Sequence, residues 1–149
     1  MAYKFAAEEL EPNAQEWDRN KIFPVDKLKE AAELGFGAIY VSEENGGCGL
    51  GRLEASLIFE ALSTGDVGVS AYISIHNMCA WMIDKYGTQD QKDQYLPDMV
   101  TMERLSSYCL TEPDSGSDAQ AMKTFAEDRG DHWIVNGNKA FISGSGQEG

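Results

Sequence analysis

The chain has 149 residues, 42% of them hydrophobic, and 12 Lys and Arg against 25 Asp and Glu give a formal net charge of −13. This length suffices for one core, or for a helical domain and the start of a second domain. The negative charge disfavours nonspecific nucleic-acid binding, although backbone N–H groups can still bind cofactor phosphates. No long apolar run predicts a membrane span, and residues 1–10 resemble neither a secretory signal nor a transit peptide.

The cysteines and histidines are too widely spaced to predict a metal site. Cys48, Cys79 and Cys109 are 31 and 30 residues apart, with no CxxC pair. His76 and His132 lie far from any ligand-like spacing. We expect reduced cysteines within a core and no bound metal.

Five helices are predicted in the first hundred residues. Apolar residues recur at helical intervals over residues 1–17, where Pro12 should kink or break the helix. Pro24 suits the first position of a second helix, and Gly35 suits its left-handed C-terminal cap. The apolar residues of a third helix are Leu53, Leu57, Ile58, Ala61 and Leu62.

A glycine-rich loop precedes the third helix. The strand-like run FGAIYVS, the loop EENGGCGLGR and the helix that follows imitate a phosphate-binding turn. However, Arg52 stands where a GxGxxG starting at Gly47 needs glycine, and no GK[ST] follows. We therefore prefer a plain loop leading into a helix over nucleotide binding, with Glu43 and Glu44 as solvated charges.

Residues 68–86 are apolar nearly all the way round, which predicts a core helix enclosed by others. His76 is more often a hydrogen-bonded core side chain than a ligand or base in such a setting. Met78, Trp81 and Met82 favour packing over a cofactor site.

The pattern changes after the last predicted helix, which begins at a Thr88–Gln91 capping box. Residues 105–110 look like a short strand, and alternating residues surround a turn at Arg129–Gly130. We predict an α+β fold, in which a helical domain of residues 1–101 precedes the start of a small antiparallel β-barrel-like domain at residues 102–149.

Two segments rich in hydroxyl and aromatic residues follow predicted strands. YCLTEPDSGSD (residues 108–118) offers short donors and backbone N–H groups without positive charge, which suits a flat hydrogen-bonding ring or a pyrophosphate. For this segment alone, a plain β turn is the preferred interpretation. NGNKAFISG (residues 136–144) is a second such segment, and the two together favour a binding site.

These two segments resemble the flavin-contacting signatures of the acyl-CoA dehydrogenase family, and their spacing also fits. The resemblance covers essentially the whole chain, including LGFGAIY, the GG-containing loop and the EAL-type helix. It implies FAD as cofactor and α,β-dehydrogenation of an acyl-CoA. AYISIHNMCAWMID (residues 71–84) is similar to the branch that oxidises the short branched isobutyryl group in valine catabolism. Substrates with a 2-methylbutyryl or short straight-chain acyl group are the alternatives.

The resemblance also implies roles for individual residues. Phe141 matches the aromatic residue, often Trp, beside the isoalloxazine, and Ser143 matches a hydroxyl directed toward flavin N5. Ser117 matches a position that also touches the thioester part of the substrate. Asp114 departs from the family's usual glycine, and its charge should slightly weaken pyrophosphate binding. The cofactor-binding residues implied are Tyr108, Cys109, Leu110, Thr111, Gly116, Ser117, Phe141, Ile142 and Ser143.

Glu112 invites a role as general base, but the resemblance implies that the base is a glutamate of a later helical domain. No catalytic residue is therefore assigned within the chain, which we expect to be a fragment that binds FAD poorly and lacks activity by itself. Full-length relatives imply a homotetramer that passes electrons to electron-transferring flavoprotein in the mitochondrial matrix. The alternative from another class is a non-catalytic helical interaction protein.

Overall fold

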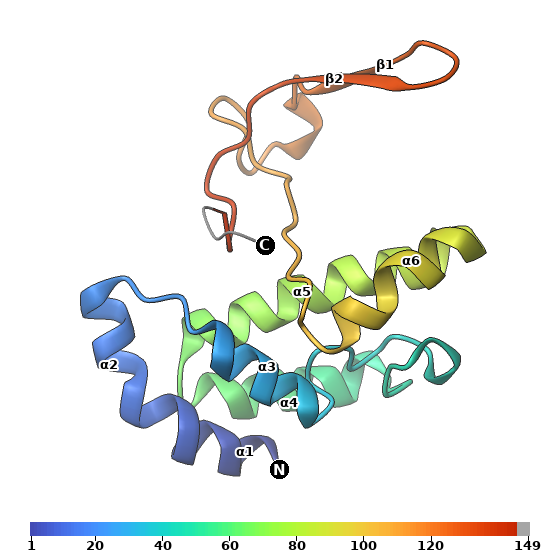
Figure 1. Cartoon of the computed structure of the whole chain (residues 1–149). Coiled ribbons are helices and arrows are strands. Elements are labelled where there is room, and N and C mark those ends of the chain that lie inside the picture. Colours follow the sequence, from blue (N-terminus) through green and yellow to red (C-terminus); the bar gives the residue numbers. More distant parts are fainter. Residues whose placement is uncertain (146–149) are drawn as a thin grey trace.

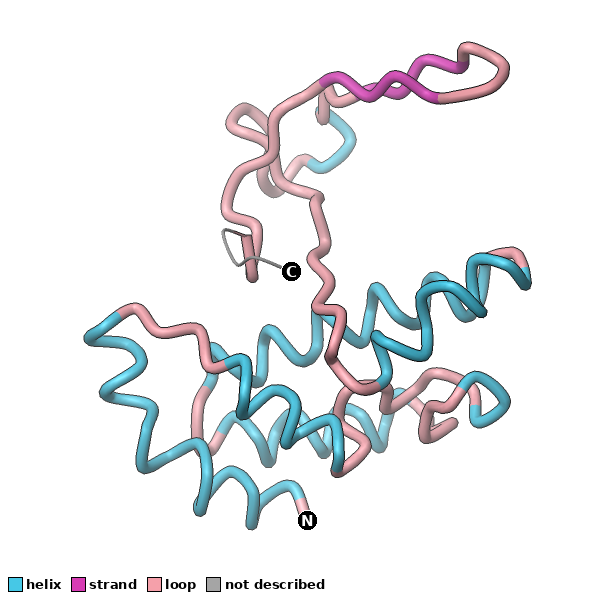
Figure 2. Tube along the Cα trace, in the orientation of Figure 1, coloured by secondary structure: helices cyan, strands magenta, loops and turns pink. Residues whose placement is uncertain are grey.

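The computed structural model describes residues 1–145, with α-helices up to residue 100 and, after them, an extended segment that contains one short 3₁₀ turn, η3 (Ala119–Ala121). The helices pack together as one layer (Figure 1), and the extended segment leaves the end of the last helix, forms a hairpin and returns toward the helices. Figure 2 shows that the strands lie away from the main group of helices. Residues 146–149 of the predicted second domain lie outside the described part of the chain.

The first helical stretch is distorted at Pro12 but continues through it. It comprises α1 (Ala2–Phe5), a π-helical turn η1 (Ala6–Leu10) and α2 (Glu11–Asn20), with Pro12 in the first turn of α2. Proline has no N–H to donate to the preceding turn of helix. That preceding turn, η1, is the one that widens into a π-helix. The predicted kink is thus a change of helix type.

Helix α3 (Val25–Glu33) ends as the sequence predicts. Gly35 has φ +86, and the N–H groups of Gly35 and Phe36 donate to carbonyls of the last helical turn at 2.8 and 3.0 Å. This pattern is a Schellman cap, which needs a left-handed residue at the position of Gly35. Pro24 stands immediately before the helix.

The predicted strand over FGAIYVS is wrong, because residues 36–41 form consecutive turns. The fully buried Asn77 of helix α5 (Val67–Tyr86) holds these turns: its amide donates to Phe36 O at 2.8 Å, and its carbonyl accepts from Ile39 N at 2.6 Å. A short apolar run cannot be assigned from periodicity alone. Here a side chain from a distant helix replaces the hydrogen bonds of a strand partner.

The glycine-rich loop is hydrogen-bonded to the turns that precede it. The N–H groups of four successive residues donate to carbonyls of residues 38–42 at 2.8 to 3.0 Å; these donors are Gly47, Cys48, Gly49 and Leu50. They are therefore unavailable to a phosphate, which supports the plain loop over nucleotide binding. Helix α4 (Arg52–Ser63) follows.

Asp84 near the end of α5 anchors this loop. Its carboxylate accepts from the hydroxyl and N–H of Ser42 at 2.8 and 3.1 Å and from the amide of Asn45 at 2.6 Å. Burial raises the pKa of the Asp84 carboxyl, but hydrogen bonds from Asn45 and Ser42 outweigh burial and lower the pKa below its ordinary value.

Helices α5 (Val67–Tyr86) and α6 (Gln89–Val100) complete the helical layer. The predicted capping box is confirmed, since the Thr88 and Gln91 side chains each bind the other's backbone N–H. The expectation that α5 is enclosed on all sides is wrong among residues 1–145. Its exposed apolar residues include Val67, Met82 and Tyr86.

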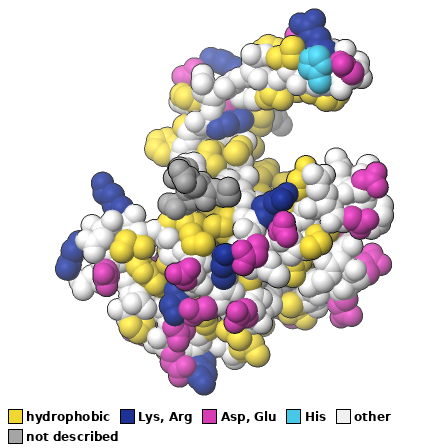
Figure 3. Space-filling view, viewed as in Figure 1, with side chains coloured by type: hydrophobic (Ala, Val, Ile, Leu, Met, Phe, Trp, Pro, Cys, Tyr) yellow, Lys and Arg dark blue, Asp and Glu magenta, His cyan; other side chains and the backbone are white. Residues whose placement is uncertain are grey.

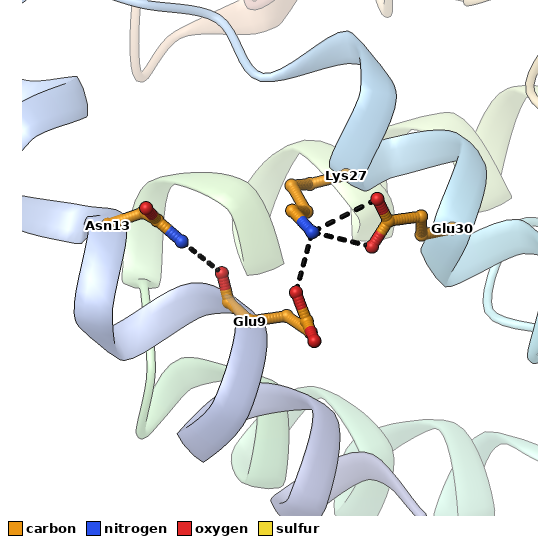
Figure 4. Close-up of polar contacts among 4 residues, drawn as sticks. All are labelled: Glu9, Asn13, Lys27 and Glu30. Carbon is orange, nitrogen blue, oxygen red and sulfur yellow. Dashed lines mark hydrogen bonds and ion pairs between the residues drawn. The ribbon is translucent and has the colours of Figure 1, made fainter.

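Two clusters of buried side chains form the core, one joining α1, α3, α4 and α5, the other joining residues 38–41 to α5 and α6. At the edge of the first cluster, Lys27 of α3 lies between two carboxylates (Figure 4), 2.6 Å from Glu9 and 2.7 Å from Glu30. These partly exposed pairs contribute little, about 0–1 kcal/mol each. Apolar burial is therefore the main source of stability in this layer.

The described part of the second predicted domain contains one hairpin. Strands β1 (Phe125–Asp128) and β2 (Trp133–Asn136) are antiparallel, with Phe125 opposite Asn136, and Gly130 turns at φ +90 as predicted. Residues 105–110 are extended but form no strand within residues 1–145, so that prediction is wrong. Helices with an antiparallel hairpin agree with the α+β prediction, and the division at residues 101/102 stays a prediction.

No helix in residues 1–145 is long and apolar enough to cross a membrane. Within the same residues, no three His, Cys, Asp or Glu side chains are grouped to hold a metal ion.

Candidate functional site

The two hydroxyl-rich segments, residues 108–118 and 136–144, lie side by side. Ala140 N–H donates to Thr111 O at 2.9 Å. Near the ends of the segments, the Ser107 hydroxyl donates to Ser143 O at 2.7 Å. In Figure 1 the two segments, the first in orange and the second in red, run between the hairpin and α5. Segments that the sequence separates therefore form one surface.

Two side chains of α5 tie this surface to the helical layer. The Tyr72 hydroxyl donates to Ser106 O at 3.1 Å, and Gly144 lies so close to Tyr72 that a Cβ there would be 2.7 Å from the ring. His76 Nε2 is 2.8 Å from Met99 O, and its Nδ1 is 2.9 Å from Ser106 Oγ. The interpretation of His76 as a hydrogen-bonded core side chain is confirmed.

The surroundings of His76 favour its neutral form. A carbonyl oxygen can only accept, so Nε2 carries the proton and Nδ1 accepts from Ser106. Burial lowers the pKa of His76 below its ordinary value, opposed in part by the hydrogen bond to Met99 O.

Glu112 is buried at the centre of the site, with a side chain only 5% exposed. Its carboxylate accepts from Lys123 N at 2.6 Å, from Thr124 N at 2.9 Å and from Lys139 Nζ at 2.9 Å. Lys139 also donates to Leu110 O at 3.1 Å. A buried charge persists only when it is paired and hydrogen-bonded, and Glu112 meets both conditions.

These contacts argue against Glu112 as a base. The hydrogen bonds that its carboxylate accepts from the Thr124 and Lys123 N–H groups and from the Lys139 ammonium lower the pKa of Glu112 to about 2. Among the described residues the Thr124 hydroxyl makes no hydrogen bond and so adds no donor. A general base needs a pKa near the working pH. Glu112 is instead a permanent anion within the site.

A tight turn follows Glu112 and presents its tip to solvent. Glu112 and Ser115 exchange backbone hydrogen bonds, and the Ser115 hydroxyl donates to Asp118 O at 2.6 Å. Gly116 and Ser117 are exposed, and a Cβ at Gly116 would meet nothing within 4 Å. Residues 115–118, which follow this turn, therefore leave space for a ligand at Gly116.

The extra charge of Asp114 is offset by Lys123, which lies beyond the end of the segment. Its carboxylate lies 3.0 Å from Lys123 Nζ, with both side chains 75% exposed. An exposed pair of this kind is screened by water and contributes little to stability.

The nine predicted cofactor-binding residues fall on the shared surface with different exposure. Tyr108, Cys109, Gly116, Ser117, Phe141 and Ser143 are exposed, while Leu110, Thr111 and Ile142 are partly buried. Within residues 1–145, no hydrogen bond engages the hydroxyl groups of Thr111, Ser117 and Ser143.

Phe141 is the most unusual member of this set. Its side chain is 96% exposed and its backbone has φ +56, in the left-handed region that non-glycine residues seldom adopt. Hydrophobic side chains lie on the extended segment and on the helices facing it (Figure 3). An exposed aromatic ring beside free hydroxyl groups fits a flat, hydrogen-bonding ring system such as a flavin.

The sequence interpretation missed Lys139 and the surroundings of Glu112. Lys139 is the single charged residue of NGNKAFISG, and that isolation was the available signal. The two backbone N–H groups that bind Glu112 carry no sequence signal.

Comparison with known proteins identifies the family of this chain. Residues 1–103 match the N-terminal domain of acyl-CoA dehydrogenases, and residues 107–148 match the middle domain. This chain belongs to the acyl-CoA dehydrogenase family. It is 58% identical over 146 residues to isobutyryl-CoA dehydrogenase, mitochondrial, of Dictyostelium discoideum, and 53% identical over 147 residues to the protein of the same name from Bos taurus. These matches cover 98% and 99% of the chain but 35% of each relative.

The fold is also that of solved acyl-CoA dehydrogenases. A glutaryl-CoA dehydrogenase from Mycobacterium smegmatis, in complex with FADH2, matches with a TM-score of 0.89 and 30% identity. The match covers 95% of this chain and 36% of that chain. The chain thus spans about a third of the length of its relatives, and its close relatives carry the isobutyryl-CoA dehydrogenase name that the sequence indicated.

Proposed function

We propose that the chain forms the N-terminal helical layer and part of the flavin site of an FAD-dependent dehydrogenase that acts on isobutyryl-CoA. One observation carries the choice of substrate: the 58% and 53% identity, over nearly the whole chain, to proteins named isobutyryl-CoA dehydrogenase. Identity to the glutaryl-CoA dehydrogenase structure is lower, at 30%. The alternatives of a 2-methylbutyryl or short straight-chain acyl group become outcomes of the test.

The proposed flavin site is the surface formed by the two segments. FAD supplies the acceptor for a hydride from the substrate. In this proposal Phe141 packs beside the flavin ring, and the hydroxyls of Thr111 and Ser143 donate to it. Ser117, at the open turn, contacts the substrate near its thioester. The remaining contributors are Tyr108, Cys109, Leu110, Gly116 and Ile142.

The catalytic base in this proposal is a glutamate outside these 149 residues, because the one buried carboxylate of the described site, Glu112, is held as an anion. By family, the complete enzyme is a homotetramer that reduces electron-transferring flavoprotein. Both isobutyryl-CoA dehydrogenase relatives are named mitochondrial, which supports a mitochondrial location. By family, we propose the matrix.

The test is a substrate panel on the native protein isolated from its source. Isobutyryl-CoA should bleach the flavin absorbance and show a higher kcat/KM than 2-methylbutyryl-CoA or butyryl-CoA. Faster turnover of butyryl-CoA would overturn the substrate assignment. A native protein without flavin and with the mass of these 149 residues, 16.4 kDa, would favour a non-catalytic role.

A further inference from the structure

Three stretches of chain meet at one ion pair. Glu112 belongs to the first flavin segment, Lys139 to the second, and residues 123–124 lead into the hairpin. The Lys139 ammonium spans the two segments, since it binds both the Glu112 carboxylate and Leu110 O. No other side chain in residues 1–145 contacts both segments through charge-assisted hydrogen bonds.

The backbone around this pair leaves little freedom. A Cβ at Gly137 would overlap the Thr124 side chain, so the second segment passes directly over residues 123–124. Next to Lys139, Ala140 N–H donates to Thr111 O at 2.9 Å. Phe141 comes next, with φ +56. The contacts of Lys139 and Ala140 therefore fix where the Phe141 backbone lies relative to Thr111.

We propose that the Glu112–Lys139 ion pair fixes the spacing of the two flavin segments, which makes both side chains positioning residues for the flavin. The inference rests on the proposed function, because it requires that flavin binds to both segments. Neither side chain touches the flavin in this proposal. Loss of either charge loosens the surface that Thr111, Phe141 and Ser143 share.

The test compares variants of the native flavoprotein. E112Q and K139M each remove one charge of the buried pair, and K139R keeps the charge and adds donors. E127Q and R129M are matched controls, because that ion pair in the hairpin has a similar separation of 2.8 Å but is exposed. The measurements are the FAD dissociation constant of reconstituted apoprotein, the visible flavin spectrum, and helix unfolding followed by far-UV circular dichroism.

We expect E112Q and K139M to weaken FAD binding about 10-fold or more and to alter the visible spectrum. K139R should recover part of the affinity, and the control variants should stay within about twofold of wild type. Helix unfolding should shift little in K139M, although its FAD affinity falls, and this separates positioning from general loss of structure. If E112Q does not fold, the contrast of K139M with K139R decides.

The inference is overturned if E112Q and K139M bind FAD with wild-type affinity and spectrum, or if the exposed controls lose as much affinity. If the wild type binds flavin and the variants bind it equally well, the positioning role of the Glu112–Lys139 ion pair is overturned, and the proposed function remains. A wild-type protein that binds no flavin would overturn the proposed function and this inference with it. A flavoprotein that prefers butyryl-CoA would overturn only the substrate.

Discussion

The helical layer and the extended segment are stabilised in different ways. Residues 1–100 contain nearly all the buried apolar side chains, whereas every residue of β1 and β2 is exposed. In residues 105–145 the buried side chains are polar, Glu112 and Ser115. The first region is thus organised by apolar burial, and the second by a few hydrogen bonds and one ion pair.

This difference separates a scaffold from a recognition surface. A surface that leaves aromatic rings and hydroxyl groups unpaired has those groups available for a ligand. The scaffold supplies Tyr72 and His76, which hold Ser106 at the start of that surface. Substitutions in the two regions should therefore have effects of different size.

The largest effect is expected from the core of α5. Ile73→Ala removes a fully buried side chain and should lower the free energy of unfolding by about 2–5 kcal/mol. Val67→Ala, on the exposed face of the same helix, is the control and should change it by less than about 0.5 kcal/mol. Urea unfolding measures both, and equal effects would contradict the division into buried and exposed faces.

Asn77→Ala should cost somewhat less, about 1–3 kcal/mol, because it leaves buried backbone groups of Phe36 and Ile39 unpaired. Asn77 connects α5 to the turns at residues 36–41, so hydrogen exchange should increase there first. Unchanged protection of Ile39 N–H would show that the turns do not depend on Asn77.

The pH dependence of stability tests His76. Burial lowers the pKa of His76 below its ordinary 6.5, so the folded protein binds fewer protons than the unfolded chain below that pH. Its contribution is fully present above pH 6.5 and declines as the pH falls, by at most about 1.4 kcal/mol per pH unit. Urea unfolding of wild type and H76Q should give a difference that shrinks from pH 6.5 toward pH 5. A constant difference would contradict a buried neutral imidazole.

The smallest effect is expected in the hairpin. Trp133→Ala removes an exposed ring from β2 and should change the unfolding free energy of this chain by less than about 0.5 kcal/mol. Urea unfolding of the 149-residue chain checks this. A loss above about 2 kcal/mol would show that Trp133 is covered, and the contrast between the two regions would fail.

Features with local causes were predictable from the sequence. The Schellman cap at Gly35, the Thr88–Gln91 capping box and the turn at Gly130 each depend on residues only a few positions apart. Periodicity likewise located α4 and α5. Such features need no knowledge of distant contacts.

Features with distant causes were not predictable in this way. Residues 36–41 resemble a strand until Asn77, far along the chain, is known to bind their backbone. The exposed face of α5 is equally apolar in sequence, so its pattern alone could not show which side is buried. For the site, resemblance to a family identified both segments, but the contacts of Glu112 with residues 123–124 appeared only in the structure.

The left-handed backbone of Phe141 has a consequence for how this position changes in evolution. A phenylalanine there carries about 1–3 kcal/mol of conformational strain that glycine would not. Selection for stability alone would therefore replace it, since its exposed ring offers no packing in compensation. The aromatic ring at this position therefore lowers the stability of the fold in exchange for a contact with the flavin. F141G should give a more stable polypeptide that binds the flavin less tightly.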